Sequence, residues 1–199
     1  MSAGGAPVSR PLVLASGSPI RRALLAQAGY AFEVLPADIA EPQPHNVPPA
    51  ELAAALALAK AHAVAAQRPG AVVVGADQVL LLPDGTAAGK PWDRAAARAQ
   101  LRALAGRRHA LVSAAAVVAD GAEELVVDRV DLTLRALSDA ELERVLDWDE
   151  WRGNAGSYRM ESRGVHLVDT LQGDHFTVLG LPLLGLVGVL RRLGAGPLA

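Results

Sequence analysis

The residue types best suited to proton transfer and phosphate chemistry occur at a few separate places in this chain. Asp77 follows directly on an apolar segment, residues 71–75 (AVVVG), which predicts a carboxylate at the end of a buried strand. A carboxylate in that position needs a partner, and a metal ion or a water molecule that it deprotonates would serve. Asp77 could also do no more than cap the strand. Glu41, in a loop with five prolines (residues 36–49), offers either a second carboxylate or plain loop charge.

Lysine is rare in this chain. Of the 19 Lys and Arg residues, 17 are arginine, and only Lys60 and Lys90 are lysine. A lysine retained against that background suggests a site where a compact point charge fits and a planar guanidinium does not, such as a contact with phosphate. Chance in codon use explains the same count without any function.

Residues 16–22 (SGSPIRR) form a turn of small residues between an apolar segment and a predicted helix. Such a turn offers backbone N–H groups, hydroxyls and arginines together, which is what binding of a phosphate chain requires. An ordinary helix cap with arginines on the surface accounts for the same residues. The turn alone leaves both interpretations open.

Composition excludes several classes of protein. The chain has 199 residues, no cysteine and a formal net charge of -2, so disulfides and thiolate chemistry are absent and a nucleic-acid-binding face is not indicated. It contains no HExxH, Ser-His-Asp, GxGxxG or P-loop pattern. The longest apolar run, residues 178–190, includes Pro182 and is too short for a bilayer. Because the first ten residues also lack the features of a signal peptide, we expect a soluble, cytoplasmic protein without membrane or nucleic-acid partners.

Periodicity and capping residues predict the elements that must position these side chains. Helices are expected at residues 19–28, 51–67, 93–104, 138–147 and 182–194, and strands at 11–15, 31–35, 71–75, 79–82, 109–119, 124–134, 166–171 and 175–178. Asp120-Gly121 predicts a tight hairpin turn, and Ser138 with Glu141 a capping box. Because helices and strands alternate in no strict order, we expect an α/β fold with a mixed sheet.

Five short motifs stand in order along the chain: LASGSP (14–19), GADQ (75–78), GKP (89–91), AGSY (155–158) and VLGLPL (178–183). Together they resemble the Maf family of nucleoside triphosphate pyrophosphatases, once described as septum-formation inhibitors. Each motif alone is common, but the five in this order and spacing are specific. The resemblance runs from about residue 11 to residue 194.

This resemblance implies hydrolysis between the α- and β-phosphates of a nucleoside triphosphate, with a divalent cation, Mg²⁺ or Mn²⁺, as cofactor. It implies an elongated α/β structure with flanking helices and two lobes around a central cleft, similar to inosine triphosphate pyrophosphatases. A single catalytic domain would occupy residues 11–194, between a flexible N-terminus (1–10) and a C-terminal tail (195–199). Since the family tends to form homodimers, a homodimer is expected.

Motif position also assigns roles within the resemblance. The catalytic positions are occupied by Asp77, Glu41, Lys60 and Lys90, the metal-contacting ones by Asp77 and Glu41, and the phosphate-binding turn by Ser16 and Arg21. Among these, Asp77 falls on the general base of the family. The chemistry agrees, because phosphoryl transfer needs charge neutralisation and positioning more than covalent participation.

Three further positions bear on the nucleobase. The branch resembling dTTP/UTP pyrophosphatases has Arg, Thr and Gln where this chain has Ile20, Gln78 and Glu161, and the last two resemble the branch acting on 7-methyl-GTP. A carboxylate can accept hydrogen bonds from N1–H and the exocyclic amine of guanine and suits a cationic base, whereas thymine and uracil offer one such donor. That branch, however, has a tryptophan in place of Ile20, whose aliphatic side chain makes no cation–π contact.

We therefore take a 7-methyl-GTP pyrophosphatase as the leading hypothesis, with a broad-range or other modified-nucleotide pyrophosphatase close behind. A nucleotide-binding regulator of cell division without turnover is a second class, and a plain structural α/β domain is a third. The complete set of charged catalytic positions argues against the second, and the pattern of lysines argues against the third.

Overall fold

A computed structural model describes residues 10–40 and 47–198 of the chain. Its helices are α1 (Pro19–Gln27), α2 (Pro49–Ala65), α3 (Arg94–Leu104), α4 (Asp139–Asp147), α5 (His175–Val178) and α6 (Leu183–Arg192), with a 3-10 helix η1 (Arg163–Leu167). Its strands are β1 (Leu12–Leu14), β2 (Glu33–Val34), β3 (Val72–Leu81), β4 (Ala87–Ala88), β5 (Arg108–Ala119), β6 (Ala122–Leu134) and β7 (Val168–Gln172). Glu41 and residues 1–9 lie outside the described residues.

The strands form one mixed sheet in the order β2-β1-β3-β5-β6-β7, with β4 paired to β3. β1 is parallel to β2 and β3, and the other described pairs are antiparallel, which confirms the expected mixed sheet. The longest strands, β5 and β6, form the predicted hairpin. Asp120 (φ 50°) and Gly121 (φ 78°) close it in the left-handed conformation that a two-residue turn of this type requires.

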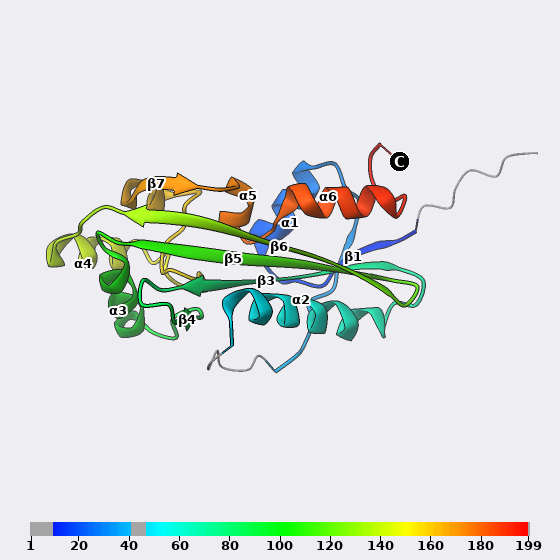
Figure 1. Ribbon diagram of the computed structural model, residues 1–199, viewed down its shortest axis with the longest axis horizontal. Coiled ribbons are helices and arrows are strands. Elements are labelled where there is room, and N and C mark those ends of the chain that lie inside the picture. Colours follow the sequence, from blue (N-terminus) through cyan, green and yellow to red (C-terminus); the bar gives the residue numbers. More distant parts are fainter. Residues whose placement is uncertain (1–9, 41–46, 199) are drawn as a thin grey trace, which may run out of the picture.

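Helices cover both faces of this sheet, and the molecule is elongated along the β5–β6 hairpin (Figure 1). One apolar cluster packs α2 against one face of β1, β3 and β5, and a second packs α1 and α6 against the opposite face. A third cluster lies at the other end, where α3 and α4 meet β6 and β7. The helices thus pack on the sheet in two groups, α1, α2 and α6 at one end and α3 and α4 at the other, as expected for two lobes. Over residues 10–40 and 47–198, no helix combines the length and the apolar character needed to cross a membrane.

Helix starts follow the local sequence. The Ser18 side chain accepts a hydrogen bond from the backbone N–H of Arg21 at the start of α1, with Pro19 in the first helical position. Asp93 caps α3 in the same way, and Ser138 and Glu141 form the predicted capping box of α4. These helices begin where the sequence predicts because each signal lies within a few residues of the start it specifies.

The contact between α2 and β3 depends on Gly75. A Cβ atom at this position would lie 2.1 Å from the carbonyl oxygen of Ala57 and 2.7 Å from the backbone nitrogen of Ala61. Gly75 thereby allows the α2 backbone to lie directly on β3, and Ala57 and Ala61 are fully buried beneath it. One turn of α2 is therefore held close to the strand residues that follow Gly75.

Two expectations about strands are wrong. Asp77 does not lie at the end of a strand: residues 71–75 and 79–82 belong to one strand, β3, and Asp77 is in its middle, opposite Ala114 of β5. Polar residues within an apolar segment suggested a break, but antiparallel pairing with β5 continues across them. Residues 175–178, expected as a strand, form the short helix α5, because the Asp174 side chain accepts a hydrogen bond from the N–H of Phe176.

Other boundaries differ by a few residues. The strand expected at 166–171 begins only at Val168, after the 3-10 helix η1, and the one expected at 31–35 is reduced to Glu33–Val34. α2 begins at Pro49, because proline is well suited to the first turn of a helix.

Candidate active site

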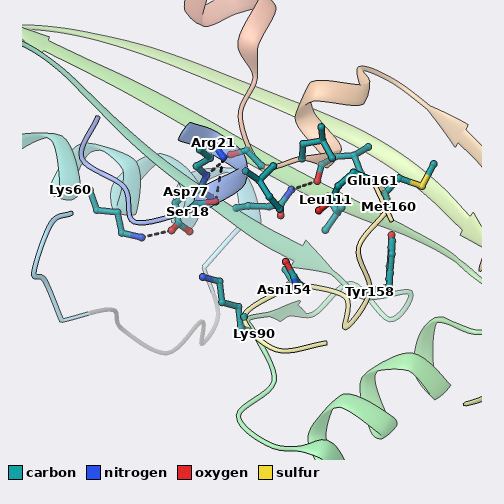
Figure 2. A pocket seen from close by; sticks show the side chains of 17 residues that line it. Ser18, Arg21, Lys60, Asp77, Lys90, Leu111, Asn154, Tyr158, Met160 and Glu161 are labelled. Atoms are coloured by element: carbon teal, nitrogen blue, oxygen red, sulfur yellow. Dashed lines mark hydrogen bonds and ion pairs between the residues drawn. The ribbon is translucent and has the colours of Figure 1, made fainter. Parts of the chain in front are cut away.

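Asp77 and Lys60 form an ion pair at the centre of the molecule. The Lys60 Nζ atom lies 2.6 Å from Asp77 Oδ1, and the two side chains are 12% and 11% exposed. Lys60 comes from α2 and Asp77 from β3, so the close approach at Gly75 brings them together. Figure 2 shows Lys60 reaching across to Asp77.

Lys90 comes from the loop between β4 and α3 and points into the same space (Figure 2). Lys60, Asp77 and Lys90 line one cavity, here called the central cavity. Its wall also includes the start of α1, residues 153–155, 158, 160 and 161, and residues 178–180. Two lysines that are 30 positions apart in the sequence therefore face the same carboxylate-bearing cavity.

A second cavity, here called the basic cavity, adjoins the first and shares Arg21, Lys60 and Lys90 with it. Arg152 and Arg159 add two further cations, and none of the described residues that line it is Asp or Glu. The Ser16-Gly17-Ser18 turn forms another part of its wall. Three of these five cations also pair with acidic side chains beyond the lining, Lys60 with Asp77, Arg152 with Asp149 and Arg159 with Glu161. A wall in which basic groups predominate suits a polyanion such as a triphosphate.

Arg21 connects three parts of the chain. Its Nε atom donates to the carbonyl oxygen of Gly180 (2.7 Å), and its Nη1 atom donates to the carbonyl oxygen of Ala76 (2.8 Å) and to Ser16 Oγ (3.2 Å). These bonds tie the start of α1 to β3 and to the loop before α6. The guanidinium is thus held in place at the edge shared by the two cavities. Ser16 is buried and lines the basic cavity, whereas Ile20 lines both.

Gln78 has a fixed amide orientation. Its Nε2 atom donates to the carbonyl oxygens of Thr177 and Val178, both at 3.0 Å, and to Ser113 Oγ at 3.1 Å. Because carbonyl oxygens can only accept, the nitrogen must face them, and Oε1 lies on the other side, beside Gly180 in the cavity wall. Gln78 therefore presents a hydrogen-bond acceptor to the central cavity.

The rest of the central cavity mixes apolar and polar side chains and includes one more acidic group. Leu111, Met160 and Val178 lie along its wall. Glu161 also lines it, and Glu161 Oε1 accepts a hydrogen bond from Arg159 Nε at 2.9 Å. Apolar surface with a few placed acceptors is typical of a pocket for a flat heterocycle.

Tyr158 and His109 form a buried pair at the same wall. The His109 Nε2 atom lies 2.9 Å from the Tyr158 hydroxyl, and the two residues are 3% and 5% exposed. Burial lowers the pKa of His109 to about 4 and raises the pKa of Tyr158, so both groups are neutral at pH 7. Tyr158 lines the central cavity (Figure 2) and places a hydroxyl there whose proton is not lost at ordinary pH.

The residues of the central cavity fit a metal ion that takes most of its ligands from the substrate. Among residues 10–40 and 47–198, no group of three or more His, Cys, Asp or Glu side chains could hold a metal ion by itself. Mg²⁺ usually binds one or two carboxylates together with substrate phosphates and water. Asp77 offers one such carboxylate beside the basic cavity, and the second predicted ligand, Glu41, lies outside the described residues.

Sequence reasoning missed several residues of the site. Ser113, Arg152 and Arg159 were not among the candidates, although the first fixes Gln78 and the others line the basic cavity. Ser113 interrupts an otherwise apolar strand segment, ALVSAAAVV, and that interruption was a usable signal. The two arginines flank the AGSY motif, but nothing in their spacing shows which way they point.

The chain is similar to known proteins over nearly its whole length. Residues 11–193 match the family model described as Maf-like protein. A nucleoside triphosphate pyrophosphatase of Rhodopseudomonas palustris is 48% identical over 191 residues, covering 92% of this chain and 93% of the relative. A 7-methyl-GTP pyrophosphatase of Mesorhizobium japonicum is 41% identical and covers 94% and 98%. A solved dITP/XTP pyrophosphatase from Mycobacterium abscessus superposes with a TM-score of 0.44 at 21% identity, over 69% of this chain and 94% of that one.

Proposed function

The chain belongs to the Maf-like family and is a nucleoside triphosphate pyrophosphatase, and from that premise we propose that its substrate is 7-methyl-GTP, cleaved to 7-methyl-GMP and pyrophosphate. The observation that carries the proposal is the juxtaposition of the two cavities. Of the residues that the structure describes, five cations and no carboxylate line one cavity. The other combines Asp77 and shared cations with apolar side chains and with acceptors from Gln78 and Glu161. A triphosphate in the first and a purine in the second would share the edge at which Lys60 and Lys90 lie.

We assign the attack on the α-phosphorus to a water molecule held by Asp77. The carboxylate takes a proton from this water as the new P–O bond forms, and the bond to the bridging oxygen breaks with release of pyrophosphate. Lys60, paired to Asp77 at 2.6 Å, holds the carboxylate in position. Lys90 and Arg21 offset the negative charge that builds up on the phosphates. A divalent cation at Asp77, and at Glu41, would supply further neutralisation of phosphate charge when bound.

The preference for a guanine-type base rests on the acceptors. Because the Gln78 amide nitrogen is occupied by Ser113 and two carbonyl groups, this side chain can only accept from a ligand. Glu161, although bonded to Arg159 through Oε1, adds a carboxylate to the same wall. The N1–H and exocyclic amine of guanine are donors that match two acceptors, whereas uracil and thymine have a single N–H donor. Methylation at N7 adds positive charge, which favours the anionic Glu161.

The test is a panel of triphosphates, 7-methyl-GTP, GTP, ITP, dTTP and UTP, assayed for pyrophosphate release with Mg²⁺ or Mn²⁺. We expect the highest kcat/KM with 7-methyl-GTP. Comparable rates across the panel would instead support the broad-range enzyme, for which the aliphatic Ile20 is a favourable feature. Binding of triphosphates without any turnover would contradict the proposed chemistry and support a regulator that has lost catalysis.

Two variants separate chemistry from base recognition. Asp77→Asn is expected to lower kcat by at least about 100-fold with every substrate, because the general base is lost, while Asp169→Asn on the exposed side of β7 serves as the matched control.

Glu161→Gln is expected to lower the ratio of kcat/KM for 7-methyl-GTP over UTP by about tenfold, since it removes the anion. Glu51→Gln, exposed on α2, is its control. An unchanged ratio would show that Glu161 does not read the base.

We further propose that residues 11–194 form a single catalytic domain, and that the protein acts in the cytoplasm as a homodimer. Its match to the family over residues 11–193 supports the first statement. Gel filtration with light scattering tests the homodimer, for which the expected mass is twice that of the 20.6 kDa chain.

A further inference from the structure

Two loops of the active site are joined through one side chain of α3. Gln100 Oε1 accepts a hydrogen bond from Ser157 Oγ at 2.6 Å, and Gln100 Nε2 donates to the carbonyl oxygen of Gly89 at 3.1 Å. Ser157 belongs to the segment 155–158, and Gly89 immediately precedes Lys90. Gln100 therefore bridges the loop that carries Tyr158 and the loop that carries Lys90.

The bond to Gly89 fixes the orientation of the Gln100 amide. The Gly89 carbonyl can only accept, so the amide nitrogen must face it, and the amide oxygen is left for the Ser157 hydroxyl. The Gly89 carbonyl belongs to the peptide group that ends in the Lys90 nitrogen. A bond to this carbonyl thus constrains the plane from which the Lys90 side chain projects.

The other end of the bridge is also firmly placed. Ser157 is 1% exposed and has φ 63°, a left-handed conformation that is uncommon for a residue other than glycine. Ala155 and Tyr158, on either side of it, line the central cavity together with Lys90. Such unusual backbone conformations persist where the surrounding structure holds them, and they cluster at functional sites.

We propose that Gln100 is a positioning residue that sets where Lys90 stands relative to the base-side loop, residues 155–158. Gln100 lines neither the central nor the basic cavity, but a third cavity that it shares with Asp77, Gln78 and Lys90. Both ends of its amide are bonded, to Gly89 and to Ser157, and we assign its effect to these two bonds. The bridge fixes the distance between the charge that meets the phosphates and the wall that meets the base. This inference rests on the proposed function, because it assigns Lys90 to the phosphates.

The test uses the full chain and substrates that the wild type turns over, 7-methyl-GTP and GTP. Gln100→Met keeps the length of the side chain and removes both bonds, and Gln100→Glu keeps an acceptor for Ser157 but removes the donor to Gly89. With either variant we expect kcat to fall about tenfold, as for loss of one or two hydrogen bonds, with KM changed less than about twofold. Gln67→Met is the matched control, because Gln67 lies in the turn after α2 and its Nε2 atom bonds to the Ala63 carbonyl near the end of that helix.

A second pair of experiments separates positioning from mere stabilisation. Ser157→Ala cuts the other end of the bridge, so combined with Gln100→Met it should lower kcat no further than Gln100→Met alone. In a Lys90→Ala background, Gln100→Met should leave kcat unchanged, because the group that it positions is gone. A full additional tenfold loss in that background would overturn the inference, as would wild-type kcat in both Gln100 variants.

Failure of this inference and failure of the proposed function look different. If the wild type releases no pyrophosphate from any triphosphate, the proposed function is wrong. If the wild type is active and Gln100 variants match it in kcat, KM and melting temperature, only the bridge is wrong. The melting temperature also guards against misfolding, since a variant that has lost its fold would lose activity in every background.

Discussion

Lys60 and Asp77 are each enclosed almost completely, and their pairing has a direct consequence for substitution. The Lys60 side chain is 12% exposed, and its Nζ atom lies 2.6 Å from Asp77 Oδ1. A guanidinium carries the same charge on a larger, planar group, which would have to displace either α2 or the carboxylate. The identity of the cation therefore matters at this position as well as its charge.

Lys60→Arg and Lys90→Arg are expected to lower kcat by roughly 10- to 100-fold, because small misplacements of charge are costly in phosphoryl transfer. Both variants should retain the wild-type circular dichroism spectrum. The matched control is the reverse exchange, Arg68→Lys, in the exposed ion pair that Arg68 forms with Glu33, where kcat should not change. Wild-type kcat in both lysine variants would mean that the two lysines of the chain are accidental.

Helices, strands and turns could be predicted where the residues that determine them lie close together in the sequence. α1, the capping box of α4 and the Asp120-Gly121 turn were correct because their determinants are local. The predicted position of Asp77 at a strand end was wrong because β3 continues through its polar residues by pairing with β5. That strand comes more than 30 residues later, and no local pattern shows the pairing. The same reason hid the bonds of Gln78 to residues near position 177. The family motifs named site residues, but only the fold shows how they are held.

The packing of α2 on β3 makes a prediction at the same scale. Gly75→Ala would place a methyl group 2.1 Å from the Ala57 carbonyl oxygen, so α2 must shift. We expect the free energy of unfolding to fall by about 2–3 kcal/mol, as for overpacked cores, and kcat to fall as well, because α2 carries Lys60. Urea unfolding and pyrophosphate release measure the two effects.

Gly188→Ala in α6 is the control for this substitution. Its added methyl group would meet only the end of the Arg192 side chain, at 3.9 Å, and removal of a helical glycine should stabilise the protein by roughly 0.5–1 kcal/mol. If Gly75→Ala were as stable as the wild type, the close contact between α2 and β3 would not exist.

The whole molecule relies on small side chains. Alanine makes up 40 of the 199 residues, and many of them are fully buried between the sheet and α2, where Ala53, Ala57 and Ala61 face Ala114 and Ala116. Small residues let the layers approach closely there, while most of the larger buried side chains elsewhere in the interior are leucines. His109 and Tyr158 are the polar aromatic pair among these larger side chains.

Stability of the whole fold should fall in mild acid because of His109. Its pKa is about 4 in the native protein and about 6.5 when unfolded, owing to burial. Below pH 6.5 the unfolded chain binds a proton that native His109 does not, so stability declines as the pH falls toward 4 and this contribution then levels off. The shift corresponds to roughly 3 kcal/mol.

Urea unfolding at pH 7 and pH 4.5 measures how much the free energy of unfolding changes in acid. Because carboxylates also contribute to this change, the variant must be compared with the wild type. His109→Gln should lose part of the pH dependence seen in the wild type, whereas His175→Gln, at an exposed position, should keep it all. Equal pH dependence in the His109 variant and the wild type would contradict the assignment.

The β5–β6 hairpin also bears on the order in which the chain can fold. Its first partners, Ala119 and Ala122, are three residues apart, and pairing can extend outward from the turn to Arg108 and Thr133 with little further loop entropy. β1, by contrast, pairs in parallel with β3, sixty residues later, as in Leu12 opposite Val72. Contacts between distant segments slow folding, so the hairpin that spans both ends of the molecule can form early, and closure of the β1–β3 edge is the slow step. Because the turn is already formed when this edge closes, substitutions in it should lower the refolding rate by their full effect on stability, and those in β1 by only part of theirs.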